Sequence, residues 1–294
     1  FRNNVKRRFG SSYLKTVVLL GLSVGLALAA AIHSTATHAA TGKPLAEIVG
    51  EERWENLKDQ LFGDQPIDDT GGVVLLQIPG RALDGARVPL TVRALVPQSA
   101  DSYIEKLYLI VDNNPLPVAG TFTFEPNQGW DTIDTEIRLN EYSSTRAVVQ
   151  MNDGSLFMDS SFVKASGGCS APPSSYERSD ANLLGKISGG VSPLLDPEVP
   201  AAARIRIVHP NASGMQFDQF TRTYIQPHYV HTMVAEFNGE TLFKLETNFS
   251  LSQDPVLGFN FTPQEDGELL IYALDSKDQR FEQSWPIVGG GATN

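Results

Sequence analysis

The sequence predicts an all-β protein: two β-sandwich domains joined by a flexible linker, with one short helix before the first domain. Short runs of alternating apolar and polar residues recur about seven times in roughly 100 residues, which is a spacing typical of β-sandwiches. A second series of such runs occupies the C-terminal third of the chain. Between the two series, the alternation stops in a stretch rich in glycine, serine and proline.

The first 39 residues have the features of a secretion signal. Basic residues without any acidic residue precede an apolar run at 17–31, and small residues at 37 and 39 fit a cleavage site. The run is shorter than the ~20 residues that cross a bilayer, so we expect export to the periplasm and not a retained anchor. The pair Arg7–Arg8 does not decide between the Sec and the twin-arginine route.

The chain is acidic, with a net charge of −11. Without the five basic residues of the signal, 18 basic residues remain against 34 acidic ones, which is a net charge of −16. Nucleic-acid phosphates need cationic contacts, so this balance excludes nucleic acid as a partner, and it disfavours anionic membrane surfaces in the same way. It favours solubility and a basic protein partner.

The first domain is expected over 40–165. Trp54, Leu57 and Leu61 share one helical face, which predicts a helix over 51–62. The strands are expected at 73–78, 87–96, 107–111, 121–124, 135–139, 146–151 and 156–164. Asp-Gly pairs between strands are hairpin signals, because the turns they form need positive φ angles.

Residues 166–202 predict a carrier arm and linker, and the second domain follows over 203–288. A flexible stretch of this length spans on the order of 30 Å, which suits an arm better than a packed loop. The strands of the second domain are expected at 203–208, 230–237, 241–246, 256–261, 268–274 and 280–286.

Cys169 is the only cysteine of the chain, and it follows Gly167 and Gly168. A free cysteine usually packs among aliphatic residues, whereas two glycines provide a slim and flexible backbone. We therefore expect the thiol to be presented on an accessible arm, with the glycines as its hinge. No internal disulfide can form, so in an oxidising compartment the thiol is free and reactive or paired with another molecule. An incidental loop cysteine is the alternative.

Other chemistries are not predicted. Of the three histidines His209, His228 and His231, the last two point to opposite faces of a strand, and no cysteine or glutamate lies at a ligand spacing. We therefore expect no metal site and no cofactor. The chain has no serine-nucleophile elbow and no nucleotide-binding loop. A thiol with only Lys164 nearby can accept a group but is a poor catalyst, so we expect a carrier and not an enzyme.

Two sets of motifs resemble known families. The first set resembles SoxY of the periplasmic sulfur-oxidation system and comprises Pro79-x-x-Ala-x-Asp-Gly85, Asn113-Asn-Pro115-x-Pro117, Thr135-x-Ile-Arg138 and Gly167-Gly-Cys169. The second set resembles SoxZ and comprises His209-Pro210, Ile225-x-Pro227, Asn238-Gly239 and Ser252-x-x-Pro255. A fusion of this kind looks most like the quinoprotein-dehydrogenase-associated SoxYZ-like carriers.

The resemblance implies two immunoglobulin-like sandwiches that pair within the chain. It also implies that Cys169 carries sulfur intermediates covalently between periplasmic sulfur-oxidising enzymes, as in thiosulfate oxidation. The chain departs from the family pattern after the cysteine, where Ser170 replaces a glycine and the chain continues into a second domain. The alternative is a non-catalytic adaptor of a PQQ-dependent quinoprotein (alcohol or methanol) dehydrogenase, in which the thiol has no function.

Overall fold

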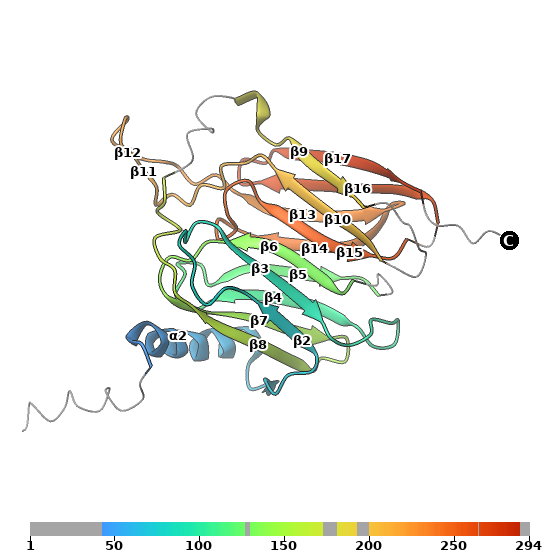
Figure 1. The fold of residues 1–294 in the computed structure, drawn as a ribbon, viewed down its shortest axis with the longest axis horizontal. Coiled ribbons are helices and arrows are strands. Elements are labelled where there is room, and N and C mark those ends of the chain that lie inside the picture. Colours follow the sequence, from blue (N-terminus) through green and yellow to red (C-terminus); the bar gives the residue numbers. More distant parts are fainter. Residues whose placement is uncertain (1–42, 127–129, 173–180, 193–199, 264, 289–294) are drawn as a thin grey trace, which may run out of the picture. The chain divides into compact units, whose positions relative to one another are not determined.

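The structure is a computed structural model that describes residues 43–126, 130–172, 181–192, 200–263 and 265–288. The predicted secretion signal lies outside these residues. The chain from Leu45 onward forms one compact unit, and most of its elements are strands, so the predicted all-β class is confirmed (Figure 1). In the described part of the chain, no helix is long and apolar enough to cross a membrane.

The α-helix of the described residues, α2 (Leu45–Phe62), begins earlier than predicted and covers part of one sheet. Its Trp54 is buried, and the guanidinium of Arg146 lies 4.6 Å from the centre of the indole ring. Arg146 also forms ion pairs with the buried Asp112 (2.8 Å) and with Glu51 of the helix (3.2 Å). These contacts attach the helix to the sheet at one point and in one orientation.

The strands follow the predicted ones closely. In the first half they are β2 (Val74–Gln77), β3 (Val88–Ala94), β4 (Ile104–Val111), β5 (Val118–Phe124), β6 (Thr132–Ile137), β7 (Ser143–Met151) and β8 (Leu156–Val163). In the second half they are β10 (Ala201–Ile207), β13 (Val230–Phe237), β14 (Glu240–Thr247), β15 (Val256–Phe261), β16 (Gly267–Asp275) and β17 (Arg280–Ile287). Four short strands were not predicted: β1 (Ile67–Asp68), β9 (Ile187–Val191), β11 (Phe217–Asp218) and β12 (Thr223–Tyr224).

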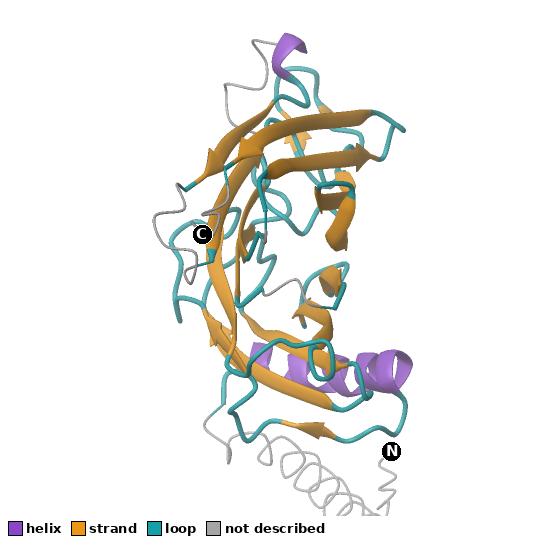
Figure 2. Ribbon diagram, turned by 90° about the vertical axis from the view of Figure 1, so that its right-hand side faces the viewer, coloured by secondary structure: helices purple, strands orange, loops and turns teal. Residues whose placement is uncertain are grey.

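Two large sheets run through both halves of the chain. One has the order β1-β8-β7-β4-β5-β14-β13-β16-β17, and the other has the order β2-β3-β6-β15-β10-β9. The halves are joined by the antiparallel pairs β5–β14 and β6–β15, so each sheet continues from one half into the other. Figure 2 shows the strands as a continuous curved layer. A single apolar core extends across this joint, for example from Leu107 to Leu245. Two sandwich domains joined by a flexible linker were expected, whereas the sheets are continuous.

The stretch predicted as arm and linker is partly structured. Strand β9 lies within it and pairs antiparallel with β10. Gly189 of β9 has a φ of 129°, and a Cβ atom there would lie 2.1 Å from the carbonyl oxygen of Arg204. The glycine therefore permits a close approach of the two backbones, and the linker-like composition concealed a strand. Residues 173–180 and 193–199 lie outside the described part of the chain.

Candidate functional site

The cysteine segment, residues 167–169, follows β8 and is held by backbone hydrogen bonds. Gly167 has a φ of 76°, and its N–H donates to the carbonyl of Asn140 (2.9 Å). The N–H of Gly168 donates to the carbonyl of Leu139 (2.9 Å). The segment therefore adds to the loop that follows β6 and does not project from the fold.

Gly168 is packed too closely to act as the predicted hinge. A Cβ atom at this position would lie 2.0 Å from the carbonyl oxygen of Gly85 and 2.8 Å from that of Leu139. Real Cβ atoms do not approach backbone oxygens this closely, so only glycine fits. Gly168 therefore permits close packing in this position. Gly167 differs, because a Cβ atom there would meet no atom within 4 Å.

Cys169 is fully buried, with 0% of its surface exposed, which corrects the expectation of an accessible thiol. The hydroxyl of Ser213 donates to the carbonyl of Cys169 (2.5 Å), and the N–H of Ser213 donates to the side chain of Gln216 (2.9 Å). The loop 209–216 therefore covers the cysteine. Composition suggested an exposed arm because the residues that contact the segment are distant in the sequence, Arg138 by 30 positions and Ser213 by more than forty.

Burial changes the chemistry of the thiol. It raises the pKa of Cys169 from its ordinary value of 9.0 to about 11, and the nearby positive charge of Arg138 opposes this rise only in part. The thiolate is the nucleophilic form of cysteine. In this position the thiol is therefore almost entirely protonated at neutral pH.

The structure brings together two of the three histidines that were considered as metal ligands. The Nε2 atoms of His209 and His228 lie 3.4 Å and 2.6 Å from Oδ2 of Asp275, and all three residues are buried. His231 is placed elsewhere, where its Nδ1 lies 2.9 Å from the hydroxyl of Thr232.

The hydrogen bonds of this His-His-Asp cluster do not fit a metal. The backbone N–H of Asn211 donates to Nδ1 of His209 (3.0 Å), so the proton of the neutral ring lies on Nε2. Nε2 then donates to Asp275 and has no lone pair for an ion. Burial lowers the pKa of His209 to about 4, and the neighbouring His228 adds to this effect, so the ring stays neutral. The cluster is a hydrogen-bond network that supports the covering loop.

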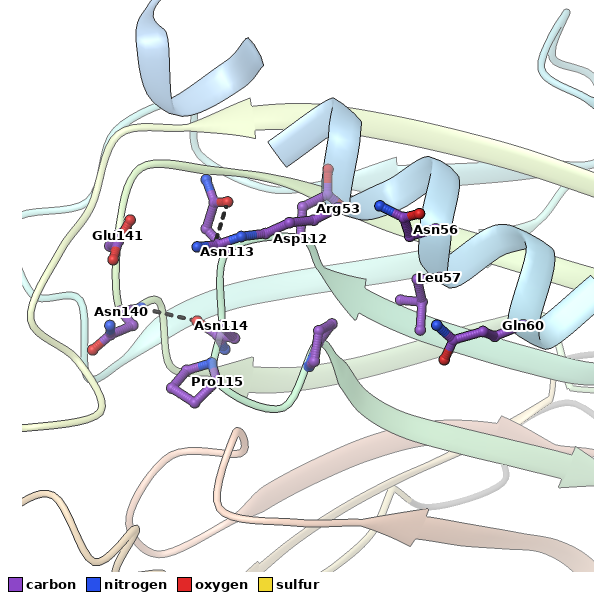
Figure 3. A pocket seen from close by; sticks show the side chains of 11 residues that line it. Arg53, Asn56, Leu57, Gln60, Asp112, Asn113, Asn114, Pro115, Asn140 and Glu141 are labelled. Carbon is purple, nitrogen blue, oxygen red and sulfur yellow. Dashed lines mark hydrogen bonds between the residues drawn. The ribbon is translucent and has the colours of Figure 1, made fainter. Parts of the chain in front are cut away.

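A polar groove of about 490 Å³ lies between α2 and the turn after β4 (Figure 3). Arg53, Asn56 and Gln60 line it from the helix, and the guanidinium of Arg53 donates to Asn113 (3.1 Å). Asn140 also lines the groove, and its carbonyl accepts the hydrogen bond from the N–H of Gly167 in the cysteine segment. Cys169 is not a lining residue of the groove, so the groove does not give access to the thiol.

Two protein-family models match the chain. Residues 58–169 match the family model of the sulfur oxidation protein SoxY, and residues 196–286 match that of the sulphur oxidation protein SoxZ. The chain is a SoxY–SoxZ fusion. The SoxY match ends at Cys169 itself, and the two domains in tandem support a carrier role in sulfur oxidation.

Solved structures show weaker similarity. The sulfur carrier protein SoxY from Chlorobium limicola f thiosulfatophilum is 21% identical with a TM-score of 0.34, and the match covers 40% of this chain and 96% of that one. A superoxide reductase (neelaredoxin) from Ignicoccus hospitalis is 18% identical with a TM-score of 0.28, and the match covers 31% of this chain and 79% of that one. No curated protein matches the chain.

Arg138 connects the SoxY half to the SoxZ half at the cysteine. It is 3% exposed, and its guanidinium donates to three backbone carbonyls. These belong to Gly168 of the SoxY half (3.1 Å) and to Asn211 (3.3 Å) and Leu251 (3.2 Å) of the SoxZ half. Arg138 stands in a SoxY motif of the sequence, but nothing in the sequence indicated this role. Its partners could be found only from the fold.

Proposed function

We propose that this SoxY–SoxZ fusion is a non-catalytic periplasmic carrier that holds sulfur-containing intermediates covalently on Cys169 and presents them to partner enzymes. The position of Cys169 carries the proposal. The only cysteine of the chain ends the SoxY match and lies at the joint with the SoxZ half, under residues of both. The secretion signal predicted over 1–39 supports the periplasmic location.

Two reactions attach sulfur to Cys169 with atoms and electrons balanced. In the first, the thiolate of Cys169 attacks the outer sulfur of a persulfide on the partner enzyme. A new S–S bond forms, the partner's S–S bond breaks, and the partner leaves as a thiolate, so no oxidant is needed. In the second, thiosulfate is joined to the thiol as a thiosulfonate. This reaction releases the thiol proton and two electrons, which an electron-accepting partner enzyme must take up.

Both reactions require the cysteine segment to leave its buried position. A pKa of about 11 leaves very little thiolate at neutral pH. Departure into water restores an ordinary pKa, which raises the thiolate fraction about a hundredfold because each pKa unit is a factor of ten. The buried position therefore protects the sulfur, and the released position reacts.

One observation favours a second function. A thiol that is fully buried is also what a chain would show if the cysteine had no chemical role. The fusion would then be an adaptor of a PQQ-dependent quinoprotein dehydrogenase, and binding to that enzyme would depend on its surface alone.

Gene replacement in the native host distinguishes the two functions. A strain with Cys169→Ser should lose sulfur oxidation to the same extent as a deletion strain, because serine cannot form the S–S bond. The variant should reach wild-type abundance. If Cys169→Ser oxidises sulfur compounds normally while the deletion strain loses quinoprotein dehydrogenase activity, the adaptor function holds and the carrier function is wrong.

A further inference from the structure

Exposed apolar side chains gather on the loops around the cysteine segment. Ten large apolar residues of the described part of the chain are exposed. Two of them lie on loops whose backbone contacts the cysteine segment, and three lie on the hairpin β11–β12, which follows the covering loop. We call these five the apolar collar: Leu83, Tyr142, Phe217, Phe220 and Tyr224. Exposed apolar patches on soluble proteins commonly mark interaction sites, and aromatic residues are enriched there.

The hairpin β11–β12 supplies three collar residues and projects from the body of the fold (Figure 1). Phe220 at its tip is 81% exposed and Tyr224 is 62% exposed. The hairpin begins directly after Gln216, whose side chain accepts the N–H of Ser213. Because the hydroxyl of Ser213 donates to the carbonyl of Cys169, two hydrogen bonds connect the residue before the hairpin to the cysteine.

The other two collar residues belong to the SoxY half. Leu83 is fully exposed, on the loop whose Gly85 packs against Gly168. Tyr142 is 42% exposed and lies two positions after Asn140, whose carbonyl accepts the N–H of Gly167. The collar therefore comes from both halves and is connected to the cysteine segment from both.

We propose that the apolar collar is the docking surface for the enzyme that exchanges sulfur with Cys169, and that this enzyme presents apolar side chains around the entrance of its active site. The inference rests on the proposed function, because only a partner that receives the thiol needs this location. The hairpin carries one acidic residue, Asp218, and one basic residue, Arg222, so its own charges cancel. Docking therefore depends on burial of apolar surface and little on salt.

Sulfur loading in the native host tests the collar with a matched control. The variants Leu83→Ser and Phe220→Ser each remove one exposed side chain from the collar. Leu95→Ser is the control, because Leu95 is 48% exposed and directly follows β3, at the opposite end of that strand from the collar. A strand of seven residues separates the two ends by about 20 Å. Each protein is purified from cells grown on thiosulfate, and the Cys169 adduct is quantified by mass spectrometry.

We expect the amount of adduct to fall about tenfold in both collar variants, because burial of one large apolar side chain in an interface raises the affinity by about tenfold or more. The reaction rate of the purified, unloaded variants with iodoacetamide should equal that of the wild type, since the covering contacts of Cys169 remain. Leu95→Ser should match the wild type in both measurements.

Normal loading of Leu83→Ser and Phe220→Ser would overturn the collar proposal while leaving the carrier function intact. A wild-type protein without any adduct would overturn the carrier function and the collar proposal with it. Two further results would assign the collar to another partner and overturn the proposal: collar-dependent binding to vesicles of phosphatidylglycerol, or collar-dependent dimerisation seen by light scattering.

Discussion

Adding a single methyl group at Gly168 should release the buried thiol. In Gly168→Ala the new Cβ atom would lie 2.0 Å from the carbonyl oxygen of Gly85 and 2.8 Å from that of Leu139. Both neighbours are backbone atoms, so no side-chain rotation relieves the clash. The segment has to move away, and the hydrogen bond from the N–H of Gly168 to Leu139 is lost with it.

The size of the effect follows from the packing and the pKa. Overpacking of this kind costs about 2 kcal/mol, which raises the released population roughly thirtyfold. Each released molecule regains an ordinary thiol pKa in place of about 11. The assay is the second-order rate of Cys169 with iodoacetamide from pH 6 to 10. We expect a rate at least tenfold higher for Gly168→Ala at pH 7.5.

Gly167→Ala is the matched control. A Cβ atom at this position meets no atom within 4 Å, so the only cost is that of a φ of 76° in an alanine, about 1 kcal/mol. The rate should therefore rise less than in Gly168→Ala. An unchanged rate and pH profile for Gly168→Ala would refute the reasoning, because the thiol would then not depend on this close packing.

Three further predictions concern the surroundings of the cysteine and the helix. Ser213→Ala removes the hydrogen bond to the carbonyl of Cys169, worth about 1 kcal/mol, and should raise the iodoacetamide rate about fivefold. The pKa of His209 is about 4 in the folded chain against an ordinary 6.5. The neutral ring therefore contributes to the free energy of unfolding above pH 6.5, and this contribution is lost as the pH falls towards 4. Urea unfolding should show a loss of about 3 kcal/mol over this range, and a smaller slope in His209→Gln. Arg146→Met leaves the carboxyl of Asp112 buried without its partner, and should lower the free energy of unfolding by about 3–5 kcal/mol; a loss below about 1 kcal/mol would contradict the assigned role.

Local patterns were sufficient to predict most elements of the fold. Strands such as β13 (Val230–Phe237) were predicted at their observed limits, because the turn signal Asn238-Gly239 marks the residue at which this strand ends. The continuity of the sheets could not be predicted, since β5 and β14 are more than 100 residues apart and their pairing leaves no local signal. Strand β9 was missed because Gly189 and Gly190 favour a linker by composition, although Gly189 is needed for the close approach of β9 to β10.

Cys169 stays a predicted attachment site, and its surroundings were not predicted from the sequence. A lone cysteine after two glycines was sufficient to select Cys169, and the family match ends at this residue. The same glycines suggested a flexible hinge, whereas Gly168 allows the segment to pack against the backbone of Gly85 and Leu139. Arg138 and Ser213, which hold the segment, are ordinary polar residues in the sequence, and only the joint between the halves brings them to the cysteine.

The most direct test of the carrier function is the mass of the intact protein isolated from its native host during growth on thiosulfate. The carrier function predicts mass increments of sulfur atoms or sulfonate groups that map to the peptide containing Cys169. A reductant should remove them, and Cys169→Ser should lack them while remaining folded. A native protein whose mass is always that of the unmodified chain, with Cys169 free in every preparation, would contradict the claim that this cysteine carries sulfur.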